Sequence, residues 1–131
     1  MSNINFIEEA KAIEYEIREN RRYLHQNAEV GFDLPKTIEF VKNKLEELGC
    51  QVTPCGKNGL VTLIGNGEGK NFLLRADMDA LPIKEEADID FNCKNGNMHA
   101  CGHDFHTAML LGTAKLLKNH ENEIKGTVKL M

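Results

Sequence analysis

Residues 102–119 read GHDFHTAMLLGTAKLLKN, and this stretch decides the fold. Its apolar residues recur at helical spacing. The buried stripe that this spacing predicts consists of Ala108, Leu111, Ala114 and Leu117. β-rich residues precede the helix at 72–76 and follow it at 127–131. Strand, helix and strand in this order predict a βαβ unit with two parallel strands and a right-handed crossover.

Two further helices are expected before this unit. The first is a long, charged helix over residues 4–27, where apolar residues recur near 3.6-residue spacing. The second begins at Pro35, which suits the first turn of a helix, and ends at Gly49.

Short strands are expected at 51–54, 60–64 and 71–75. The glycine-rich run 65–70 separates the last two and predicts a hairpin connection. This run fits no phosphate loop, because it is followed by a strand where a dinucleotide loop opens a helix. Together with the βαβ unit, these elements predict the α/β class, with a mixed sheet and flanking helices.

Length and composition indicate a globular domain without a nucleic-acid or membrane partner. The 131 residues include 41% hydrophobic residues and carry a formal net charge of −4, which suits one domain. Basic residues form no patch for a nucleic acid, and no stretch reaches the roughly 18 apolar residues of a membrane span. The N-terminus lacks the basic start and apolar run of a signal peptide. We therefore expect the four cysteines to be thiols in the reducing cytoplasm.

Two clusters of metal-ligating residue types flank the βαβ unit. Residues 98–106 read MHACGHDFH, with one thiol, three imidazoles and a carboxylate, and residues 75–82 read RADMDALP, with two carboxylates. Cys, His and Asp are side chains that hold transition metals. A crossover helix begins at the end of the sheet where its preceding strand finishes. The two clusters are therefore expected to meet at one edge.

Residue types within the clusters indicate individual roles. We expect Cys101, at a helix start that favours the thiolate, and His103 to bind the metal. A lone Cys or His at a helix start is usually structural, but this clustering favours a metal site. We expect His25 and His120 on the surface. His106 lies one helical turn beyond His103 and is a further candidate, and Asp104 could cap the helix or accept an imidazole N–H. Asp77 and Asp79 are candidates with Arg75 as their partner, and Glu85 is expected at the rim of the site.

The two motifs resemble a known family. Residues 75–82 followed by 98–106 are similar to the N-terminal part of the metal-dependent N-acyl-amino-acid amidohydrolases. This is the hippurate hydrolase and auxin-conjugate hydrolase group, which is related to aminoacylases and zinc carboxypeptidases. Further matches are Arg21-Arg22-x-Leu24-His25 with Glu29, and Gly126-Thr127-Val128. The resemblance covers the chain from about residue 20 and implies a zinc-peptidase-like catalytic domain.

The resemblance implies an amidase for N-acyl amino acids or small peptides. Two divalent ions, of Zn²⁺, Mn²⁺, Co²⁺ or Ni²⁺, would lower the pKa of a shared water and polarise the scissile carbonyl. By position, Cys101 and His103 correspond to metal ligands and Asp79 to the acid that orients the site. Asp77 stands where wider relatives have a metal-binding His, and Phe105 where a Gly is usual.

The resemblance also implies that residues 1–131 are one partial catalytic domain. In the family, the strand matching 127–131 leads into a Gln-Pro-Ala-Glu-Glu segment, whose first Glu is the general base and whose second is a metal ligand. Two more His ligands and a lid or dimerisation domain follow. We therefore expect a longer parent protein able to form homo-oligomers. The isolated chain is expected to bind metal weakly or not at all and to be inactive.

Two other functions stay open at this point. The clusters could form a structural metal site in a non-catalytic module, although the spacing from Cys93 to Cys101 fits no common zinc-finger pattern. Alternatively, Cys101 could be a nucleophile that works with His103 or His106 and with Asp104. Chelators separate the last function from a metal-dependent amidase, because a thiol hydrolase should survive metal removal.

Overall fold

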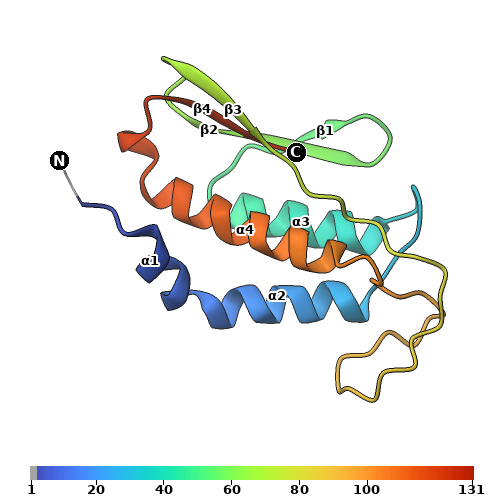
Figure 1. Cartoon of the computed structure of the whole chain (residues 1–131). Helices are drawn as coiled ribbons and strands as arrows, with labels where there is room; N and C mark the ends of the chain where they lie inside the picture. The colour runs from blue at the N-terminus through green and yellow to red at the C-terminus, as the bar shows by residue number, and fades with distance from the viewer. Residues whose placement is uncertain (1–2) are drawn as a thin grey trace.

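The computed structural model describes residues 3–131 and shows three layers (Figure 1). α3 and α4 cover one face of the sheet, and α2 packs on α4 on the side away from the sheet. The opposite face of the sheet carries the exposed residues Leu63 and Leu73. The elements are α1 (Phe6–Ala12), α2 (Glu14–Gln26), α3 (Pro35–Glu47), β1 (Thr53–Cys55), β2 (Gly59–Gly65), β3 (Lys70–Leu74), α4 (His103–Asn119), the 3₁₀ turn η1 (Glu121–Glu123) and β4 (Gly126–Leu130).

The predicted βαβ unit has parallel strands, as expected. β3 and β4 pair in parallel, with Phe72 opposite Val128, and α4 connects them. α4 packs between the sheet and α2, and a Cβ placed at Gly112 would come within 2.8 Å of Ile17. Glycine at this position therefore allows α2 to approach closely. The buried stripe of α4 includes Ala108, Leu111 and Ala114. The handedness of the crossover stays a prediction.

The predicted hairpin between β2 and β3 is wrong. The strand order is β1-β2-β4-β3, so β4 lies between them, antiparallel to β2 and parallel to β3. The glycine run carries the chain across the start of β4, where the N–H of Gly67 donates to the C=O of Gly126 at 3.3 Å. A Cβ at Gly65 would lie 2.2 Å from the Gly126 oxygen, and one at Gly126 would lie 2.1 Å from the Lys70 oxygen. These glycines are needed for close backbone approach, not for a hairpin turn.

The single helix predicted over residues 4–27 is two helices. Ile13 separates α1 from α2, with φ −107° and ψ 11°, outside the helical region. The break lets α1 follow the far end of α4, where His120 packs edge-on against Phe6 and its Nε2 lies 2.8 Å from Glu9. His120, which was expected on the surface, is therefore partly covered. Local periodicity cannot show a break that depends on a residue 111 positions away.

The remaining elements follow the sequence closely. α3 begins at Pro35 as predicted and ends two residues before Gly49, whose φ of 81° is left-handed. β1 is displaced slightly from the expected 51–54. Among residues 3–131, no helix has the length and apolar character needed to cross a membrane.

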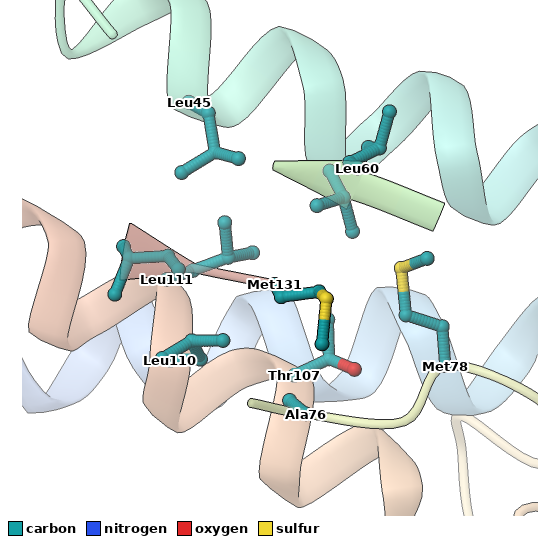
Figure 2. A pocket seen from close by; sticks show the side chains of 10 residues that line it. Leu45, Leu60, Ala76, Met78, Thr107, Leu110, Leu111 and Met131 are labelled. Carbon is teal, nitrogen blue, oxygen red and sulfur yellow. The ribbon is translucent and has the colours of Figure 1, made fainter. Parts of the chain in front are cut away.

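A small apolar cavity of about 40 Å³ lies where the sheet meets α3 and α4. Figure 2 shows Leu60, Met78 and Met131 around it. Its polar lining residue, Thr107, donates its hydroxyl to the backbone oxygen of Asp77 at 2.9 Å. This hydrogen bond ties α4 to the chain that leaves β3, beside the polar clusters.

Candidate metal centre

The two polar clusters meet at the carboxyl end of β3. β3 ends at Leu74, whose carbonyl oxygen accepts the N–H of Met131 at 2.9 Å, and the chain continues into residues 75–82. α4 begins at His103, after Gly102 in the left-handed conformation with φ 77°. Because α4 crosses over to a parallel neighbour of β3, its first turn lies at the end of the sheet where β3 finishes.

His103 is hydrogen-bonded to Asp79. Its Nδ1 lies 2.8 Å from the backbone oxygen of Asp79 and 3.1 Å from the carboxylate Oδ1. A carbonyl oxygen can only accept, so Nδ1 donates, and the lone pair of the neutral ring is on Nε2. Nε2 lies 3.9 Å from Oδ2 of Asp77. The hydrogen bond thus fixes the tautomer and ring orientation that a metal ligand requires.

Asp77 is fixed at both its carboxylate and its backbone. Arg75 Nη2 lies 2.5 Å from Oδ1 of Asp77, and Thr107 bonds its carbonyl oxygen. The Arg75 side chain is 61% exposed, so it lies at the edge of the site. The separation of 3.9 Å between His103 Nε2 and Asp77 Oδ2 is short enough for one ion to touch both atoms, since each ligand atom lies about 2.0–2.2 Å from a zinc ion.

Cys101 and His106 are exposed residues on either side of His103 in the chain. The rings of His103 and His106 stack with centroids 5.7 Å apart and an interplanar angle of 30°. Within residues 3–131, no three His, Cys, Asp or Glu side chains form a group that could hold a metal ion.

A hollow of about 540 Å³ opens beside this group. Arg75, Asp77 and Asp79 line one part of it. Phe32, before α3, and Lys57, between β1 and β2, line another, and the Lys57 ammonium lies 5.0 Å from the centre of the Phe32 ring. The hollow has room for a small substrate and presents charges of both signs.

Asp104 is fully buried, although it follows His103 directly. Its Oδ2 accepts from Arg21 Nε at 2.8 Å and lies 2.8 Å from Nδ1 of His25. Its Oδ1 accepts the N–H of Phe105 at 2.9 Å. Asp104 is therefore an acceptor for an imidazole, but the imidazole comes from α2 and not from its own cluster.

Glu85 and His25 are both interior residues, so the expectations of a rim residue and a surface residue are wrong. Glu85 is 7% exposed; its Oε1 lies 2.7 Å from His25 Nε2 and its Oε2 accepts the N–H of Cys93 at 2.6 Å. Burial alone would raise the pKa of Glu85, but the bonds from His25 and Cys93 and the nearby charges lower it overall. Arg21 and His25 are four residues apart on α2, beside the buried Leu24. Because residues four positions apart lie on the same face of a helix, this spacing indicates that Arg21 and His25 face the interior together.

His99 belongs to the same motif but lies in the interior. It is 5% exposed, and among the described residues neither ring nitrogen has a hydrogen-bond partner. Burial lowers the pKa of His99, against the opposing charge of Asp104. The three imidazoles of the motif are therefore unequal, and His103 and His106 are the more exposed ones.

The sequence of this chain is similar to a known protein family and to several of its relatives. Residues 73–131 match the peptidase family M20/M25/M40. The chain is 46% identical over 113 residues to the IAA-amino acid hydrolase ILR1-like 5 of Arabidopsis thaliana. It is 45% identical over 114 residues to the N-acyl-L-amino acid amidohydrolase of Geobacillus stearothermophilus. Over residues 73–131 the chain is therefore similar to the M20 peptidase family.

The matches cover most of this chain but a minor part of its M20 relatives. Both cover 85% of this chain, and they cover 26% of the Arabidopsis and 31% of the Geobacillus protein. The chain thus spans about a quarter to a third of the length of these curated relatives. Both motifs that carry the resemblance, 75–82 and 98–106, lie inside the matched range 73–131.

A solved M20 structure shows the same fold. The YXEP protein of Bacillus subtilis, described as a dinuclear metal binding peptidase from the M20 family, superposes with a TM-score of 0.85 at 40% sequence identity. The superposition covers 92% of this chain and 34% of that protein. The mixed sheet with flanking helices, predicted from the sequence, is the α/β fold of M20 peptidases.

Proposed function

We propose that this chain contributes to the metal centre of an amidohydrolase that cleaves the amide bond of N-acyl amino acids or small peptides. The observation that carries the proposal is the hydrogen bond from His103 to Asp79, which leaves Nε2 facing Asp77 at the end of β3. The relatives named as an IAA-amino acid hydrolase and an N-acyl-L-amino acid amidohydrolase support the substrate class.

The residues divide into ligands and residues that orient them. We assign Nε2 of His103, the Cys101 thiolate and Asp77 as ligands, although in residues 3–131 these three are not gathered around one point, and Asp79 as the residue that holds the His103 ring. The dinuclear centre described for the YXEP protein supports two ions. Thiolate, imidazole and carboxylate together suit Zn²⁺, Mn²⁺, Co²⁺ or Ni²⁺. Bound ions would supply Lewis-acid activation of a water and of the scissile carbonyl.

Arg75 and the general base that follows β4 in the family have roles other than binding the metal. Arg75 offsets part of the charge of Asp77 and, at the edge of the hollow, stands where a substrate enters. Proton transfer is assigned to the Gln-Pro-Ala-Glu-Glu segment that the resemblance implies. We also propose a reducing, cytoplasmic location, which the free thiols of Cys50, Cys55, Cys93 and Cys101 support.

A chimera tests the proposal. Residues 1–131 would replace the matching segment of the Geobacillus amidohydrolase, and hydrolysis of an N-acetyl amino acid would be measured with and without metal. We expect activity that needs a divalent ion and that falls more than about a hundredfold in Cys101→Ala and in His103→Ala, because a lost ligand removes several kcal/mol of activation.

The control is His120→Ala, at the far end of α4, which should leave the activity of the chimera unchanged. Full activity in the metal-stripped chimera would refute the proposal. If Cys101→Ala is then inactive while chelators have no effect, Cys101 is a nucleophile and the thiol-hydrolase alternative holds.

A further inference from the structure

Three distant parts of the chain meet at the side chain of His25. Its Nδ1 lies 2.8 Å from Asp104, in the first turn of α4, and its Nε2 lies 2.7 Å from Glu85, in the segment after Asp79. The side chains of His25, Asp104 and Glu85 are only 4%, 0% and 1% exposed. One buried imidazole therefore connects α2, α4 and the segment between β3 and α4.

That segment depends on such contacts for its course. Residues 80–102 contain isolated bridges but belong to none of the helices and strands of the fold. Leu81 and Met98 exchange two backbone hydrogen bonds of 2.9 Å, and Glu85 holds the N–H of Cys93. The segment is also held at Ala80, Asn95 and Asn97, which bond the backbone oxygens of Ala28 and Glu29. Of these points, the one at Glu85 is attached to His25.

The first turn of α4 is held on two sides. His103 bonds Asp79 on one side, and Asp104 bonds His25 and Arg21 on the other. Successive residues of an α-helix are about 100° apart around its axis. Fixing Asp104 in the interior therefore sets the direction of His103, whose side chain stays 22% exposed.

We propose that His25 is a positioning residue for His103 and Cys101, acting through Asp104 and Glu85; this inference rests on the proposed metal centre. The buried carboxylates of Asp104 and Glu85 share His25 and are further satisfied by Arg21 and by the N–H of Cys93. Removing the imidazole leaves both carboxylates short of a partner. The first turn of α4 then loses one of its two interior anchors, Arg21 being the other, and Nδ1 of His103 is no longer held firmly on Asp79.

The test uses the 131-residue chain, with NMR of the histidine ring nitrogens and titration with Co²⁺. In His25→Gln, His103 should lose its single Nδ1–H tautomer, and the affinity for Co²⁺ should fall about 10- to 100-fold, as is typical when a group that orients a ligand is lost. His120→Gln is the matched control. The ring of His120 also lies between two carboxylates, Glu9 and Glu123, and both readouts should be unchanged.

A second pair of variants decides the question if His25→Gln does not fold. The amide in Glu85→Gln can donate to His25 and accept from Cys93, so this variant should keep the His103 tautomer, whereas Glu85→Ala should lose it. An unchanged His103 spectrum in folded His25→Gln or in Glu85→Ala overturns the proposal. The tautomer is read without metal. If the wild-type chain shows the Nδ1–H tautomer of His103 but binds no Co²⁺, the proposed metal centre is contradicted, whereas the positioning role of His25 is not.

Discussion

His25 and His103 lie near the same turn of α4 and use their ring nitrogens differently. Both nitrogens of His25 lie within 2.8 Å of buried carboxylates. In His103 one nitrogen bonds Asp79, and the other faces Asp77 across 3.9 Å, beyond hydrogen-bond range. Both nitrogens of the first ring are bonded inside the protein, whereas the second ring keeps a lone pair that can bind a metal ion.

The comparison indicates which feature would separate a structural histidine from one that is able to bind a metal ion. Both histidines stand near carboxylates, so the nearby charge does not distinguish them. The second nitrogen does, because a ring with two short hydrogen bonds has no lone pair to offer. His99 is a third case, buried with neither nitrogen bonded among residues 3–131.

The largest difference between the two histidines should be in stability. His25→Ala leaves two buried carboxylates without their shared partner and should lower the free energy of unfolding by about 3–5 kcal/mol. His103→Ala should lower it by less than about 1 kcal/mol, since only the hydrogen bonding of Nδ1 to Asp79 is lost, from a ring that is 22% exposed. Urea unfolding of the two variants measures both values. Equal losses would show that His103 is as structural as His25.

Asp79 should affect metal binding more than stability. Asp79→Ala removes one of the two oxygens that hold Nδ1 of His103, and the backbone oxygen stays in place. We expect the affinity of the chain for Zn²⁺, already weak without further ligands, to fall about tenfold. Competition against a zinc-sensitive dye measures this. The control is Glu86→Ala, outside the site. If Asp79→Ala leaves the affinity for Zn²⁺ unchanged, Asp79 does not orient the ring of His103 for metal binding.

The smallest effect is expected at His120, a third histidine with two carboxylate partners. Hydrogen bonds to the carboxylates of Glu123 and Glu9 raise the pKa of His120 above its ordinary value. The contact therefore stabilises the docking of α1 fully below a pH of about 6.5 and is lost as the pH rises through the raised pKa. Amide-exchange protection in α1 should fall modestly over this range. His120→Gln should abolish the dependence, and a wild-type protection that is flat with pH would contradict it.

Local patterns were enough for the βαβ unit and for the meeting of the two clusters. The apolar stripe of α4 is periodic, and a crossover helix has to begin where β3 ends, so residues 75–82 and 98–106 meet for topological reasons. The order of the strands in the sheet could not be predicted from such local patterns. The glycines at 65–70 look like a turn, and only the later insertion of β4 shows that Gly65 and Gly126 serve a crossing.

The interior partners of the site were missed for a related reason. Glu85 has no local feature that separates it from a solvated acid, and its burial depends on His25, 60 residues earlier in the chain. Only the spacing of Arg21 and His25 on α2 indicated an inward-facing pair. Charged residues become buried through partners distant in sequence, and a single sequence does not display such pairs.

The central claim is that Nε2 of His103, with Asp77, receives the metal while Nδ1 stays on Asp79. Anomalous diffraction from crystals of the chain soaked in Zn²⁺ tests it most directly. The predicted result is an anomalous peak at bonding distance from Nε2 of His103 and from the Asp77 carboxylate, with the bond from Nδ1 to the Asp79 oxygen retained. A peak on Nδ1 of His103, or an ion bound at His25 or His99 with His103 left free, would contradict the account.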